Sequence, residues 1–132
     1  KPQGFGSIAA PDGAAVYVAT LPGNPVSVFV SFHVFVRPVL AALSGKEGRA
    51  ALQTRAATTT VAWKSPAGKR QFVPVHLTEA ERVGDTPTVT PTHRLGARSH
   101  FVASLHQANA LAIVPEEVTE VEQWSLVDVL PC

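Results

Sequence analysis

Residues 21–27, with the sequence LPGNPVS, constrain the fold more tightly than any other part of this chain. Two prolines bracket a glycine, and each proline fixes its own backbone φ angle, so the chain must form a rigid corner here. The run before it, AAVYVAT at 14–20, is short, β-branched and aromatic, which predicts a buried strand. After it, Asn24 suits a helix N-cap, and Pro25 suits the first helical position, where its missing N–H costs nothing. The pattern predicts a strand, a corner and a helix.

A long apolar run follows the corner, at 26–43. Its valines and phenylalanines favour a strand, but the run is too long for an ordinary one. Apolar residues recur at helical spacing, at positions 28, 32, 35, 36, 39, 40 and 43, and Ser44 and Gly45 supply a stop. We predict a buried helix that Pro38 kinks. Because polar residues interrupt the run, it falls short of the ~20 uninterrupted apolar residues expected of a membrane span.

The rest of the chain has an all-β pattern. After a polar connection, candidate strands lie at 55–64, 70–78, 86–93, 99–105, 110–115 and 123–130, separated by turn signals. Such spacing predicts a sandwich or barrel. We predict an α+β chain, in which 1–45 are the end of an α/β domain and 46–132 form a small all-β domain. A parallel strand needs cover on both faces and the chain contains no methionine, so we expect a piece of a longer polypeptide.

Composition excludes several functions. A hydrophobic content of 45% with 16% charged residues describes a soluble globular protein, and a net charge of +1 argues against a broad nucleic-acid-binding face. The lone cysteine, Cys132, cannot form an internal disulfide, which suits a reducing cytoplasm, and we predict no role for its thiol. The five histidines show no metal-binding spacing and the glutamates at 116–122 resemble a solvated loop, so we predict no metal site within this chain.

The corner has the chemistry of an anion site. At a helix N-terminus the N–H groups of Val26 and Ser27 should point outward, and the helix dipole favours negative charge. Ser27 can add a hydroxyl donor. A stiff connection without a ligand is the alternative, since proline and glycine are common in turns.

Three segments together resemble one family. KPQGFG at 1–6, LPGNPVSVFVSFHVFVRPVLAALSG at 21–45 and RSHFVASLHQANALAIVPEE at 98–117 are similar to the C-terminal region of the molybdopterin molybdenumtransferases, the MoeA proteins, whose relatives include the gephyrin E domain. The resemblance implies the end of a MogA-like, molybdopterin-binding α/β domain, followed by the β-barrel-like domain IV. It also implies insertion of molybdate into adenylylated molybdopterin with release of AMP, assisted by Mg2+, in a cytoplasmic homodimer.

The resemblance also implies site residues. The substrate-binding candidates are Lys1, Pro22, Gly23, Asn24, Pro25, Ser27 and Ser99. Ser99 and His100 do not indicate a hydrolase, because adjacent strand residues point to opposite faces. Lys69 and Arg70 could face an anionic ligand, although charges in turns are usually only solvated.

This sequence departs from the family at three positions. Pro74 stands where the family carries an arginine, which puts an anion contact from that strand in doubt, and Ala110 and Gln123 replace glycines.

Two functions follow. The first is the C-terminal part of a molybdenum-inserting transferase, inactive alone because the residues that hold Mg2+ and molybdate lie mainly outside it. The alternative is a non-catalytic binding or scaffold module like the gephyrin E domain. Neither involves nucleic acid or a membrane.

Overall fold

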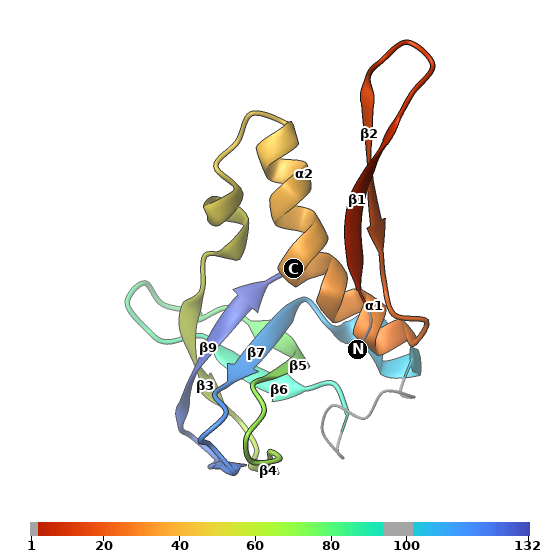
Figure 1. Cartoon of the computed structure of the whole chain (residues 1–132). Coiled ribbons are helices and arrows are strands. Elements are labelled where there is room, and N and C mark those ends of the chain that lie inside the picture. The colour runs from red at the N-terminus through yellow and green to blue at the C-terminus, as the bar shows by residue number, and fades with distance from the viewer. Residues whose placement is uncertain (1–2, 94–101) are drawn as a thin grey trace.

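The computed structural model describes residues 3–93 and 102–132. Its N-terminal part is a β-hairpin that stands beside a long helix, away from the barrel formed by the rest of the chain (Figure 1). Strand β1 (Gly4–Ala9) pairs antiparallel with β2 (Ala15–Thr20). The strand predicted at 14–20 is confirmed, but its predicted burial is wrong, since all six residues of β2 are exposed. Among the described residues the sheet of β1 and β2 contains no further strand, and nearly all of its side chains are exposed.

The predicted helix runs continuously from Pro25 to Leu43. It consists of α1 (Pro25–Ser31), a π-helical turn η1 (Phe32–Val36) and α2 (Arg37–Leu43). Pro38 has no N–H to donate, and the chain accommodates it with the wider turn, in which the Arg37 N–H bonds the carbonyl of Phe32. At the C-terminus Ser44 donates to the Leu40 carbonyl at 3.0 Å, and Gly45 adopts a φ of 74°, as predicted for the stop.

The predicted burial of this helix is wrong. Only Val26 and Ser31 are buried along α1, and none of the residues of η1 and α2 is. The helix has 19 residues with a mean hydropathy of 1.9, so by length and composition alone it could cross a membrane. The prediction that it falls short of a span is therefore not supported, although core helices of soluble proteins meet the same criterion.

The predicted barrel is confirmed. Within the described residues, β3 (Arg55–Thr59), β6 (Thr88–Pro91), β5 (Gln71–Thr78), β7 (Ala110–Val114) and β9 (Leu126–Pro131) form a closed barrel in that order. All pairings are antiparallel except the parallel pair β3–β6. Side chains that alternate along the strands fill the interior, with Ala57, Val75, Val89, Ala112 and Val129 all at 0% exposure.

Two predicted strands differ in extent. The run at 55–64 bends at Thr60, whose N–H bonds the Val89 carbonyl, and resumes as β4 (Trp63–Lys64), which pairs outside the barrel with β8 (Glu120–Val121). The run at 123–130 begins as β9 only at Leu126, because Trp124 turns with a φ of 65°.

The strand predicted at 99–105 is wrong for its described part. Residues Val102–Gln107 form the 3-10 helix η3, and residues 99–101 lie outside the described chain. A second 3-10 helix, η2 (Gly48–Leu52), occupies the predicted connection. The domain boundary at residue 45 stays a prediction.

Two hydrogen bonds hold the helix in place. The Arg37 guanidinium donates to the Pro131 carbonyl at 2.6 Å, which joins the helix to the last barrel strand. The Gln3 side-chain amide donates to Ser31 Oγ at 2.9 Å, which joins it to the residue preceding β1. The helix therefore lies against the barrel in a defined position, and this position creates the groove described next.

Candidate functional site

A groove of about 410 Å³ lies between the first turns of the long helix and the start of β5. Its helix side is mostly apolar and includes Val26, Val30, Val34 and Phe35. Its barrel side carries Lys69, Arg70, Gln71 and Phe72. Fold closure thus brings the corner at 21–27 and the basic turn, which are far apart in the sequence, to opposite walls of one space. No sequence pattern predicted that these two segments lie together.

The corner has the predicted cap but fewer amide donors than predicted. Asn24 Oδ1 accepts the Ser27 N–H at 3.2 Å, and the Asn24 carbonyl accepts the Val28 N–H at 2.8 Å. The prediction of an outward-pointing Ser27 N–H is therefore wrong, because the cap already occupies it. Pro25 has no N–H, and Val26 is only 7% exposed. The helix terminus alone is thus a poor anion cradle.

Only some of the corner residues line the groove. Pro22 and Ser27 line the groove, whereas Gly23, Asn24 and Pro25 are absent from its lining. Asn24 acts as the cap and Pro25 begins the helix. In the described structure Gly23, Asn24 and Pro25 therefore form a rigid connection, which holds Ser27 at the groove wall.

The basic turn is held to the loop after β7. Gly68 adopts a φ of 74°, a conformation that favours glycine, and its N–H bonds the Glu116 carbonyl at 2.8 Å. Arg70 Nε lies 3.1 Å from Glu116 Oε2, and both side chains are more than half exposed. An exposed pair of this kind contributes only about 0–1 kcal/mol, so Arg70 can exchange its partner for an anionic ligand. In the described part of the chain, no carboxylate forms a salt bridge with Lys69.

His33 is a titratable residue that the sequence patterns did not single out. Its ring packs against Phe29 and Phe32, with centroids at 4.6 and 5.4 Å, and its Nδ1 is buried with no hydrogen-bond partner among the described residues. Burial, and secondly the charge of Arg37, lower the pKa of His33 below 6.5. The imidazole is therefore neutral at physiological pH and adds no cation to the helix.

The thiol of Cys132 is not activated. Desolvation by the surrounding protein raises its pKa to about 11, although Arg37 acts in the opposite direction. A thiol with so high a pKa stays protonated at neutral pH and is a poor nucleophile.

Three predicted residues cannot be placed. Lys1, Ser99 and His100 lie outside the described residues. Across residues 3–93 and 102–132, no group of three or more His, Cys, Asp or Glu side chains is arranged to hold a metal ion. Pro74 is buried in β5, where it cannot supply the cationic contact of an arginine.

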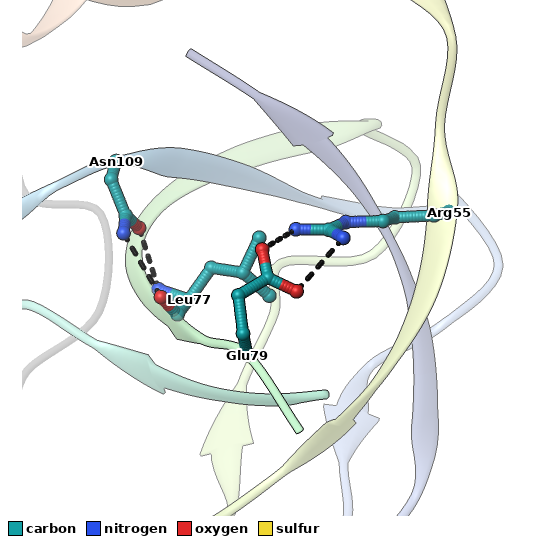
Figure 2. Close-up of polar contacts among 4 residues, drawn as sticks. All are labelled: Arg55, Leu77, Glu79 and Asn109. Atoms are coloured by element: carbon teal, nitrogen blue, oxygen red, sulfur yellow. Dashed lines mark hydrogen bonds and ion pairs between the residues drawn. The ribbon is translucent and has the colours of Figure 1, made fainter. Parts of the chain in front are cut away.

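The sequence patterns missed the structural role of Asn109. Figure 2 shows its side-chain amide facing the backbone of Leu77: Oδ1 accepts the Leu77 N–H at 2.6 Å, and Nδ2 donates to the Leu77 carbonyl at 2.9 Å. The Asn109 carbonyl also accepts the N–H of Cys132 at 2.8 Å. Asn109 therefore joins β5 to the C-terminal residue.

Nearby, the guanidinium of Arg55 donates two hydrogen bonds to the carboxylate of Glu79 (Figure 2). This ion pair joins the start of β3 to the residue after β5. It is a second contact within the barrel that no sequence pattern predicted, since the two residues are 24 positions apart.

Comparisons with known proteins agree on one family. Residues 56–132 match the model of the MoeA C-terminal region (domain IV). Molybdopterin molybdenumtransferase 2 of Mycobacterium tuberculosis is 38% identical over 120 residues, which cover 91% of this chain and 26% of the relative. Molybdopterin molybdenumtransferase 1 of the same organism is 32% identical over 127 residues, covering 96% and 29%. The chain thus spans under a third of the length of these curated relatives.

Solved structures show the same likeness. A molybdopterin biosynthesis MoeA protein from Pyrococcus horikoshii superposes with a TM-score of 0.63 at 27% identity, over 87% of this chain and 26% of that one. A molybdenum cofactor biosynthesis protein from Pyrococcus furiosus gives a TM-score of 0.58 at 30% identity, over 81% and 35%.

Proposed function

The chain belongs to the MoeA family, and on this basis we propose that it is the C-terminal part of a molybdopterin molybdenumtransferase and supplies one side of its substrate site. In this proposal residues 1–45 end a MogA-like α/β domain. The complete protein inserts molybdate into adenylylated molybdopterin and releases AMP, as a cytoplasmic homodimer. The observation that carries the proposal is the groove in which Ser27, Lys69 and Arg70 are brought together.

The groove suits an amphiphilic anion. Its apolar side, formed by Val30, Val34 and Phe35, can cover a flat ring system such as a pterin, while Lys69 and Arg70 provide cations for phosphate groups. This chain therefore contributes to catalysis by positioning the substrate and by stabilising its negative charge. Magnesium would neutralise charge on the phosphoanhydride when bound, and its ligands are proposed to lie outside this chain.

The test replaces the matched segment of Mycobacterium tuberculosis molybdopterin molybdenumtransferase 2 with this chain and measures AMP release from adenylylated molybdopterin in the presence of molybdate and magnesium. The chimera should be active and the isolated chain inactive. The double variant Lys69→Ala, Arg70→Ala should lower turnover per KM at least about tenfold, equivalent to ~1.4 kcal/mol of transition-state stabilisation.

The matched control is Arg82→Ala, which removes a cation that does not line the groove. It should leave the rate unchanged. Full activity of the double variant would remove the basic turn from the site, and AMP release by the isolated chain would refute the proposal that it is inactive alone.

The alternative function, a binding or scaffold module, has one observation in its favour. The hairpin and the helix expose large apolar side chains, including Phe5 at 56% and Leu43 at 57%. A chimera that folds and binds substrate but releases no AMP would favour this alternative.

A further inference from the structure

Two buried serines hold glutamine side chains of the groove between the helix and β5. Among the described residues, the buried polar side chains are Ser31, Thr59 and Ser65, at 4%, 0% and 6% exposure. Thr59 donates to a backbone carbonyl. Ser31 Oγ accepts a hydrogen bond from Gln3 Nε2 at 2.9 Å, and Ser65 Oγ donates one to Gln71 Oε1 at 3.2 Å. Because Gln3 and Gln71 both line the groove, two of these three buried side chains hold a residue of its wall.

The two contacts leave opposite kinds of polar atom available on the two amides. A glutamine amide has an acceptor oxygen and a nitrogen with two N–H donors. Ser31 takes up an N–H of Gln3, so Oε1 of Gln3 keeps its acceptor sites. Ser65 occupies Oε1 of Gln71, so Nε2 of Gln71 keeps its two donors. The groove wall therefore carries one acceptor and one donor, each fixed by its own buried hydroxyl.

Apolar side chains line the same groove. Val30, Val34 and Phe35 lie on its helix side and Phe72 on its barrel side. An apolar slot with a few placed polar groups is typical of a site for a small flat ligand. A ligand without matching polar atoms would leave the two amides desolvated and unpaired, which costs more binding energy than a missing methylene group does. The wall therefore selects a ring with a hydrogen-bonding edge.

We propose that Gln3 and Gln71 determine which ring the groove accepts. Oε1 of Gln3 accepts from the polar edge of a pterin, and Nε2 of Gln71 donates to it. The pyrimidinone half of a pterin has N–H donors, a carbonyl and ring nitrogens along that edge, so it can satisfy both amides. Ser31 and Ser65 are positioning residues, which act through the two glutamines. These roles rest on the proposed function, and they concern the ring of the substrate instead of its charge.

The experiment titrates the isotope-labelled chain with pterin and follows the side-chain amide signals of Gln3 and Gln71 by two-dimensional NMR. The matched ligand is quinoxaline, a flat bicyclic ring of similar size that lacks the pyrimidinone edge. Neither ligand carries a phosphate, so the basic turn has no phosphate to bind. Pterin should shift both amide signals and bind at least about tenfold more tightly than quinoxaline.

Two variants remove the polar atoms and keep much of the side-chain volume. Gln71→Leu removes the donor and Gln3→Leu removes the acceptor. Each should weaken pterin binding at least about fivefold and change quinoxaline binding by less than about twofold. The control is Gln53→Leu, which changes an exposed glutamine that does not line the groove and should affect neither ligand.

A further variant tests the positioning role. Ser65→Ala removes the hydroxyl that fixes the Gln71 amide, so it should weaken pterin binding about threefold in the wild type. In the Gln71→Leu background it should have no effect, because the amide that it positions is gone. A general loss of structure would instead lower the affinity in both backgrounds.

Three results would overturn these roles. They are no binding of pterin to the wild type, equal affinity for pterin and quinoxaline, and full pterin affinity in both Gln3→Leu and Gln71→Leu. None of these measurements uses AMP release. An active chimera whose chain does not select pterin would refute these roles alone, whereas an inactive chimera whose chain selects pterin would refute the transfer reaction alone.

Discussion

The side-chain amide of Asn109 hydrogen-bonds both backbone polar groups of Leu77, at 2.6 and 2.9 Å, and so takes the place of a paired strand residue at this point of the barrel. Leu77 belongs to β5, whereas Asn109 directly precedes β7. An asparagine is suited to this role because its amide offers one acceptor and one donor side by side.

Replacement of Asn109 should therefore destabilise the barrel. Asn109→Ala removes two hydrogen bonds and leaves the N–H and C=O of Leu77, a residue 6% exposed, without these partners. We expect the free energy of unfolding to fall by about 2–4 kcal/mol, measured by urea denaturation. The exposed Gln53→Ala should change it by less than about 0.5 kcal/mol. Equal stability of both variants would contradict the assigned role.

The N-cap of the long helix gives a second prediction. Asn24→Ala removes the acceptor for the Ser27 N–H and should lower stability by about 1 kcal/mol. Asn24→Ser keeps a side-chain acceptor and should retain most of the stability that the cap contributes. Thermal unfolding followed by circular dichroism distinguishes the two. If both variants unfold at the same temperature as the wild type, the cap contributes nothing to stability.

His33 gives a prediction for pH dependence. Its pKa is lowered below 6.5 in the folded state, so the unfolded chain binds more protons as the pH falls below that value. The stability that depends on the neutral imidazole is complete above pH 6.5 and is lost as the pH approaches the folded pKa. Urea unfolding at pH 7.5, 6.5 and 5.5 should show this loss in the wild type and a smaller one in His33→Gln.

Glu79 does not interfere with this measurement. The hydrogen bond from Arg55 lowers the Glu79 pKa below 4.5, so the stability that depends on its ionised form is lost only at more acidic pH. Parallel profiles for the wild type and His33→Gln would show that burial of His33 has no energetic consequence.

The thiol of Cys132 gives a fourth prediction. Because its pKa is about 11, the rate of alkylation by iodoacetamide should rise with a midpoint near pH 11 in the folded protein and near 9.0 in urea. A folded midpoint near 9.0 would show that the C-terminus is fully solvated.

Local chemistry made several elements predictable. Proline and glycine at 21–27, the cap at Asn24 and the stop at Gly45 act within a few residues of themselves, and each is observed as predicted. The barrel strands were predictable for the same reason, since alternation and turn residues are local signals. The strand predicted at 99–105 failed in its described part because a short apolar run fits a 3-10 helix equally well.

The sequence by itself therefore determined the corner at 21–27, where the helix begins and ends, and which segments form the barrel strands, but it predicted neither β1 nor β8. Tertiary structure alone decided which surfaces are covered, since burial depends on neighbours that local patterns do not specify. In the folded chain the helix and the hairpin are exposed, and Asn24 Oδ1 accepts the Ser27 N–H. The basic turn faces the corner across one groove. Those outcomes depend on contacts between residues distant in the sequence, such as Arg37 with Pro131 and Asn109 with Leu77, which form only when the barrel closes.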